Sequence, residues 1–226
     1  MEEISVKIAK EVKEKYGEIV LGIGVIEGVS VKPSGPQERS LLNKVTSITK
    51  SKYSLESLKN NPVIRAYRDF YWRLGIDPTK TRPASEALVR RALRGKVPLI
   101  NNVVDAGNAA SMETLVPIGL YDLDRIKGNV ELRFAKENEL FLPIGGKPEN
   151  LSSSNIVLAD EEKILHVFPH RDSQLTMIRD FTKNVLVVSC GVPGVPESLV
   201  ETALNKTVDY ILMLAGGKLI LKKIIH

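Results

Sequence analysis

Residues 61–126 read NPVIRAYRDFYWRLGIDPTKTRPASEALVRRALRGKVPLINNVVDAGNAASMETLVPIGLYDLDRI. This segment gathers helix boundaries, arginines and isolated polar residues, and we expect the rest of the chain to serve as its scaffold. Asn61 followed by Pro62 predicts a helix start, because Asn accepts unpaired backbone N–H groups and proline has none there. Apolar residues then recur at spacings of three and four as far as Leu74, and Gly75 predicts the helix end.

A second helix is predicted after an extended turn at residues 76–79. It begins at residues 83–85 and carries apolar residues at helical spacing on its core-facing side. Arginines lie mostly on the other faces of these two helices, at Arg65, Arg68, Arg90, Arg91 and Arg94. They are interpreted either as a solvated, salt-bridged surface or as contacts to the phosphates of an RNA.

Residues 99–108, LINNVVDAGN, place four polar side chains at helical spacings beside apolar valines. These are Asn101, Asn102, Asp105 and Asn108. Amides and carboxylates need hydrogen-bond partners when they are buried. The pattern therefore indicates either a capping cluster that fixes a turn or the polar edge of a ligand pocket.

Several motifs of this region occur in the order that a known family has them. They are Ala66-Tyr67-Arg68, Gly75-Ile76-Asp77-Pro78, Ser85-Glu86-Ala87-Leu88, Arg90-Arg91, Gly95-Lys96, Ile100-Asn101-Asn102-Val103-Val104-Asp105, Asn108, Pro117-Ile118-Gly119 and Tyr121-Asp122-Leu123-Asp124. In this order they resemble the B3/B4 domain. That domain is the editing domain of the phenylalanyl-tRNA synthetase beta subunit and also occurs as a free-standing protein. The resemblance continues more loosely through residues 128–187.

The resemblance implies an α+β fold with a mixed or antiparallel sheet and packed helices, and hydrolysis of mischarged aminoacyl-tRNA. The expected partner is the aminoacylated 3′ end of a tRNA, the product is a free amino acid, and no cofactor is expected. The family's pocket histidine aligns with Gly119, and Asp172 is the nearest match to a later acidic residue of the family. An ester is already reactive, so positioning alone could contribute several powers of ten in rate without that histidine.

A pocket is predicted between residues 101–108, 117–122 and 170–176. Asp105 and Asp172 are the predicted catalytic residues, Asp105 holding the amino group of the substrate and Asp172 positioning water. Predicted substrate contacts are Asn101, Asn102, Asn108, Pro117, Gly119, Tyr121, Ser173 and Thr176. For residues 170–176 the alternative is a loop held by its own hydrogen bonds.

Two other functions stay open at this point. One is a non-catalytic module that binds an amino acid, a nucleotide or RNA, which Gly119 in the histidine position favours. The other is a hydrolase or sensor for an unrelated small amide or ester.

The composition is that of an ordinary globular protein, with 43% hydrophobic and 26% charged residues among 226. The net charge of +5 permits an RNA partner, and no DNA is expected. Cys190, the one cysteine, lies in an apolar run, which excludes an intramolecular disulfide and favours a buried residue in a cytoplasmic protein. We expect no metal site, because no HExxH or paired CxxC occurs, and no membrane span.

One domain is predicted over residues 1–226, made of an N-terminal part (1–60), a motif-bearing core (61–190) and a C-terminal part (191–226). The glycines of GIGVIEG, residues 22–28, lack the spacing of a phosphate-binding loop and predict a bent or closely approached strand. Other predicted elements are a helix with Ile4, Ile8, Val12 and Tyr16 on one face, helices 38–50, 54–60 and 197–214, paired strands 129–134 and 139–144, and strands 19–31, 156–158, 164–168, 185–189 and 218–225.

Overall fold

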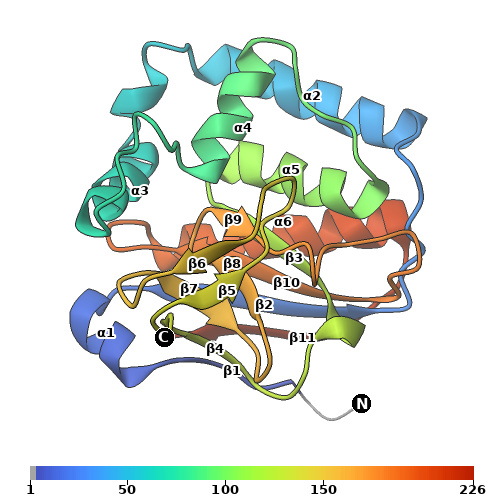
Figure 1. Ribbon diagram of the computed structural model, residues 1–226. Coiled ribbons are helices and arrows are strands. Elements are labelled where there is room, and N and C mark those ends of the chain that lie inside the picture. Colours follow the sequence, from blue (N-terminus) through green and yellow to red (C-terminus); the bar gives the residue numbers. More distant parts are fainter. Residues whose placement is uncertain (1–3) are drawn as a thin grey trace.

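Two sheets lie at the centre of the computed structural model, which describes residues 4–226 (Figure 1). The first is an antiparallel sheet of β11 (Lys218–Ile225), β2 (Val20–Glu27), β10 (Asn184–Gly191) and β3 (Ile118–Asp122), in that order. The second is a sheet of β1 (Val6–Ile8), β4 (Val130–Phe134), β7 (Ile156–Ala159), β8 (Ile164–Val167) and β9 (Arg171–Asp172). It is mixed, because β1 and β4 run parallel while the other pairs are antiparallel. A separate pair is formed by β5 (Glu139–Phe141) and β6 (Glu149–Leu151).

The helices gather mainly on one side of the four-stranded sheet (Figure 1). They are α1 (Lys10–Tyr16), α2 (Pro36–Lys52), α3 (Pro62–Arg73), α4 (Ala84–Leu93), α5 (Asn102–Thr114) and α6 (Glu197–Ala215), with short 3₁₀ turns η1 (Leu58–Asn60) and η2 (Leu123–Arg125). Helix α6 packs on β2 and β10, α5 packs on α6, and α2 and α4 pack on α5. The predicted α+β fold with packed helices is confirmed.

The four-stranded sheet is buried on both faces, which explains the continuous apolar run in β10. Val185 and Val187 belong to a core cluster with residues of α5 and α6. Leu186 and Val188, which point to the opposite face, belong to a cluster with β4, β7, α1 and α3. The five-stranded sheet is thus held against β3 and β10, and the candidate site lies where the two sheets meet.

The glycines of β2 permit close packing, as the sequence predicted. A Cβ at Gly22 would lie 2.2 Å from Oγ of Ser189 and 3.3 Å from Leu204 on α6. Strand β2 can therefore lie against its neighbours only because this position lacks a side chain.

The helix boundaries within residues 61–115 follow the predicted local signals. Asn61 accepts hydrogen bonds from Val63 N and Ile64 N, and Asn101 caps α5 in the same way through Val103 N and Val104 N. Gly75 has a φ of 73°, the left-handed conformation that glycine favours. No helix within the described residues is long and apolar enough to cross a lipid bilayer.

Three predictions outside this region were wrong. Residues from Ile4 to Tyr16 do not form one helix, because Val6–Ile8 pairs with β4 as a strand and the helix begins at Lys10. Only Leu58–Asn60 of the predicted helix 54–60 is helical. Strands β4 and β5 do not pair with each other; β4 pairs with β1 and β7, and β5 with β6. For β1 the pairing partner β4 is distant in sequence, so tertiary packing overrides the local helical pattern.

Candidate functional site

Strand β3 carries Gly119 and Tyr121 on the same face, and the two residues form one feature. The side chain of Tyr121 is completely buried. A Cβ at position 119 would lie 2.0 Å from the Tyr121 hydroxyl oxygen. The phenol therefore occupies the space in which a side chain at position 119 would begin, and only glycine admits it there.

The Tyr121 hydroxyl makes polar contacts with two residues of the other sheet. It contacts Nδ1 of His166 on β8 and donates a hydrogen bond of 3.0 Å to Oδ1 of Asp172 on β9. The β8–β9 register places His166 directly opposite Asp172. The three side chains form a cluster, called here the Tyr121 cluster, that spans the junction of the sheets.

Proton counting fixes the state of His166 in this cluster. A phenol has one proton, so when it donates to the Asp172 carboxylate it must accept from the imidazole. The Nδ1 atom of His166 then carries the proton, and Nε2 keeps a free lone pair. This Nε2 atom is buried and has no hydrogen-bond partner within residues 4–226.

Burial controls the charges of the Tyr121 cluster. Burial, with a smaller contribution from the charge of His170, lowers the pKa of His166 to about 3, so the imidazole is neutral near pH 7. Burial raises the pKa of Asp172 to about 6, while the hydrogen bond from Tyr121 opposes the rise. The Asp172 side chain is 41% exposed, and this open side moderates the effect. Near neutral pH the cluster therefore combines a carboxylate with a neutral imidazole.

A small cavity of about 30 Å³ adjoins the cluster. Its walls include Gly119, His166, Asp172, Arg171 and Cys190. This space suits a water molecule but not an amino acid, so a larger substrate would lie at its mouth, beside the exposed side of Asp172.

A much larger cavity, of about 810 Å³, lies elsewhere, beside β2, β11 and η2. The titratable side chains in its walls are the carboxylates Glu27 and Glu161, with no imidazole or thiol near them. We place the candidate site at the smaller cavity, because acid–base chemistry depends on the side chains that line a cavity and not on the volume of the cavity.

Comparison with known proteins agrees with this fold. Residues 66–216 match the B3/4 domain family. This chain belongs to the B3/4 domain family. Within 88 residues the B3/4 domain is 36% identical to the phenylalanine–tRNA ligase beta subunit of Fusobacterium nucleatum, covering 39% of this chain and 11% of that protein. It is 38% identical over 93 residues to the same subunit of Methylococcus capsulatus, covering 40% of this chain and 11% of that one.

A solved structure extends the likeness to nearly the whole B3/4 chain. It is an N-terminal fragment of the phenylalanyl-tRNA synthetase beta-subunit from Pyrococcus horikoshii, with a TM-score of 0.52 and 18% identity, covering 97% of this chain and 51% of that one. At this identity the match concerns the fold. The chain spans only about a ninth of the length of the two curated relatives above.

The predicted polar edge of α5 makes structural hydrogen bonds and lies apart from the residues that line the small cavity. Asn101 caps the helix, and Asn102 accepts from Lys32 N at 2.9 Å while donating to the carbonyls of Ser30 and Leu214. Asp105 accepts from Ile100 N at 3.0 Å and from the Ser34 hydroxyl. Burial raises the pKa of Asp105, and the Ser34 hydrogen bond opposes that rise. Of the two interpretations given above, the capping cluster describes these three residues.

The other predicted contacts are divided between the cavity and its surroundings. Pro117 and Gly119 line the cavity together with Asp172. Ser173 accepts a hydrogen bond from Leu175 N, and the buried Thr176 hydroxyl has no partner within the described residues. Asn108 is half-buried on α5. The predicted three-segment pocket is thus reduced to residues near 117–121 and 166–172.

His166 was not predicted as a site residue. The turn at Pro169, directly after the apolar run 164–168, is the signal that could have revealed a β8–β9 hairpin, and with it the His166–Asp172 pair.

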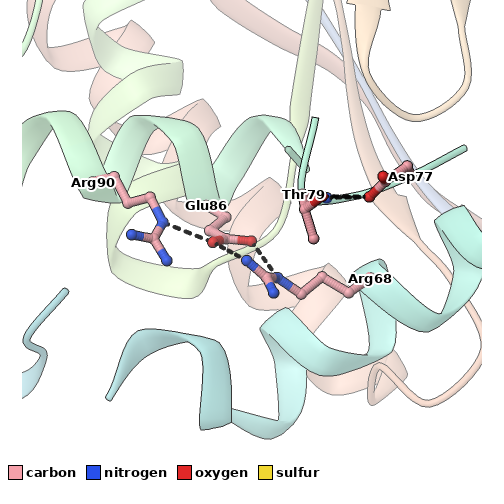
Figure 2. A network of polar contacts seen from close by, with 5 residues as sticks. All are labelled: Arg68, Asp77, Thr79, Glu86 and Arg90. Atoms are coloured by element: carbon pink, nitrogen blue, oxygen red, sulfur yellow. Dashed lines mark hydrogen bonds and ion pairs between the residues drawn. The ribbon is translucent and has the colours of Figure 1, made fainter. Parts of the chain in front are cut away.

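The arginines of α3 and α4 are divided between two roles. Glu86, completely buried on α4, accepts from Arg68 at 2.8 and 2.7 Å and from Arg90 at 2.8 Å (Figure 2). Burial is the largest single influence and by itself would raise the pKa of Glu86. The hydrogen bonds and charges of Arg68 and Arg90 together outweigh it, so the pKa of Glu86 is lowered. Arg68 and Arg90 therefore fit the salt-bridged interpretation. Arg65, Arg91 and Arg94 are exposed and have no ion pair within residues 4–226.

Proposed function

We propose that this B3/4 domain hydrolyses the ester bond of a mischarged aminoacyl-tRNA and releases the free amino acid. One observation carries the proposal: Asp172 and His166, whose buried Nε2 atom has no partner within the described residues, line a water-sized cavity and are joined through Tyr121. The relatives named as tRNA ligase subunits supply the choice of substrate. Such a reaction would take place in the cytoplasm, where tRNA is charged.

The proposed step uses Asp172 as the general base. A water molecule in the cavity gives a hydrogen bond to Nε2 of His166 and a proton to the Asp172 carboxylate as its oxygen attacks the ester carbonyl carbon. The bond to the ribose oxygen of the tRNA then breaks, and Asp172 returns the proton to that oxygen. The Nε–H group of Arg171, which is buried and unpartnered within the described residues, donates to the oxyanion, while the Nη2 atom of Arg171 pairs with Glu149.

The other predicted site residues take supporting roles in this proposal. Pro117 and Gly119 shape the cavity, and Ser173 and Thr176 hold the strand end that presents Asp172. Asn102 and Asp105 fix the loop at residues 30–34 against α5, Asn101 caps that helix, and Asn108 lies farther along it. We propose that the exposed arginines of α3 attract the tRNA.

The proposal is tested with a panel of aminoacyl-tRNAs that includes Tyr-tRNA(Phe). Wild-type protein should hydrolyse at least one of them, and Asp172→Asn should lower that rate by about a hundred-fold or more. Asp180→Asn is the matched control, because Asp180 is exposed and outside the cavity. If every ester decays at its uncatalysed rate with stoichiometric protein present, the proposal fails.

A second candidate is a binding module without chemistry. The observation that favours it is the absence of a side chain at position 119, with a cavity too small for an amino acid. Salt-dependent tRNA binding without turnover would select this function.

A further inference from the structure

A groove of about 320 Å³ runs along α3, outside the candidate site. Arg65, Asp69 and Arg73 line the helix side, Phe70 forms part of the floor, and the turn at residues 193–194 forms the opposite wall. Its volume lies in the range of small-molecule sites, so it could hold one nucleotide unit.

The groove carries an excess of positive charge. Neither Arg65 nor Arg73 has an ion pair within residues 4–226. The Arg73 guanidinium lies 5.2 Å from the centre of the Tyr16 ring, and Nζ of Lys15 lies 5.4 Å from the centre of the same ring. Asp69 is the one carboxylate among the groove-lining residues, so the two lining arginines are opposed by one anion, and Lys15 adds a further cation outside the groove lining. This balance favours a polyanion.

An exposed aromatic side chain lies on the same helix as the two arginines and next to Arg73 in the sequence. Trp72, the one tryptophan of the chain, is 57% exposed. It follows Arg65 by seven residues, which places both on the same face of α3. An exposed indole next to arginine is the combination with which proteins bind single-stranded nucleic acid, because a base stacks on the ring while the cations contact phosphates.

The buried face of α3 connects the groove to the candidate site. Tyr67 donates a hydrogen bond of 2.6 Å to the carbonyl of Cys190, which lines the water-sized cavity. The groove and the cavity are therefore separated by about one helix diameter, roughly 10 Å. A short flexible strand could lie in the groove and still reach the cavity mouth.

We propose that the α3 groove binds the single-stranded 3′ end of a tRNA, with Arg65, Arg73 and Lys15 on its phosphates and Trp72 stacked on a base. This rests on the proposed function for the identity of the RNA. Of the RNA contacts predicted from the sequence it keeps Arg65 on α3, and it replaces the α4 arginines with Arg73, Trp72 and Lys15.

The test uses the full chain with an uncharged tRNA and the same tRNA lacking its three 3′-terminal nucleotides. Because Trp72 is the sole tryptophan, its fluorescence reports stacking directly. We expect the intact tRNA to quench this fluorescence and the shortened tRNA to do so much less. Arg65→Glu with Arg73→Glu should weaken binding by about ten-fold or more and flatten its salt dependence. Asp69→Asn should strengthen binding about two-fold, because a repelling charge is removed.

The matched control makes the same change of charge on α4, as Arg91→Glu with Arg94→Glu, and should alter the affinity less than about two-fold. The proposal is overturned if the α4 pair weakens binding while the α3 pair does not, or if intact tRNA binds without changing Trp72 fluorescence. Binding to anionic lipid vesicles but not to tRNA would also overturn it. Deacylation is measured separately. If the wild type hydrolyses an aminoacyl-tRNA and the α3 variant binds tRNA as tightly as the wild type, only this inference is refuted. If tRNA binds through α3 but no aminoacyl-tRNA is hydrolysed, only the proposed enzyme activity is refuted.

Discussion

The Tyr121 hydroxyl donates a hydrogen bond to Asp172 across 3.0 Å, and this bond joins the four-stranded sheet to the five-stranded sheet. The same hydroxyl contacts His166, so one phenol orients both side chains that border the water-sized cavity. The relative placement of the two sheets is thus coupled to the geometry of the candidate site.

Removing this hydroxyl should affect both stability and activity. Tyr121→Phe keeps the ring over Gly119 but leaves Nδ1 of His166 buried without a partner. We expect a loss of about 1–3 kcal/mol in the free energy of unfolding, measured with urea, and at least a ten-fold loss of deacylation. The control is Tyr53→Phe, because Tyr53 is only partly buried. An equally small effect of both changes would contradict the role given to Tyr121.

Two variants of Asp105 distinguish a structural role of this residue from the predicted contact with the amino group of the substrate. Asp105→Asn preserves the shape of the side chain and one acceptor oxygen, so deacylation should stay within about two-fold of wild type. Asp105→Ala removes the acceptor for Ile100 N and Ser34 and should destabilise the protein by about 1–3 kcal/mol in a urea titration. Loss of hydrolysis by Asp105→Asn with an intact fold would restore the substrate-binding role.

Glu86 should be a stability residue. Glu86→Gln leaves Arg68 and Arg90, both largely buried, without their counter-charge, and should cost about 3 kcal/mol of unfolding free energy. Glu201→Gln changes an exposed carboxylate of α6 and should cost almost nothing. If Glu86→Gln were as stable as wild type, the ion pairs of Glu86 with Arg68 and Arg90 would not stabilise the fold, and this prediction would be wrong.

The protein should lose stability in mild acid. Burial lowers the pKa of His166 to about 3 and that of His170 to about 4, so the unfolded chain binds more protons than the folded one below pH 6.5. Asp172 has a raised pKa in the folded protein, so between pH 4 and 6 its protonation stabilises the folded state. The two histidines together outweigh this single carboxyl group. Urea titrations from pH 7 to pH 4 should give falling free energies, and His166→Asn should reduce the slope. A flat profile would contradict the buried, neutral histidines.

Features that depend on local signals, such as the ends of helices, could be predicted from the sequence. Asn61, Gly75 and Asn101 mark helix ends by their own chemistry, and the structure places those ends where the signals lie. The site is different, because Tyr121 lies 45 residues from His166 and 51 from Asp172. Those side chains meet only after two sheets pack, and no periodicity along the chain reports that contact. The predicted polar edge of α5 had the right residue types for a pocket, but its side chains are engaged in hydrogen bonds to the backbone and to Ser34, several of them far away in the sequence.

The pH dependence of deacylation tests the central claim most directly. Single-turnover rates are measured from pH 5 to pH 8 on the most reactive aminoacyl-tRNA of the panel, for wild type and Asp172→Asn. Asp172 must be ionised to accept a proton, and its pKa is about 6, so the wild-type rate above background should rise through about pH 6 and then level off. Asp172→Asn should remove this step and nearly all of the rate. An Asp172→Asn variant with the wild-type rate and the same pH step would contradict the account.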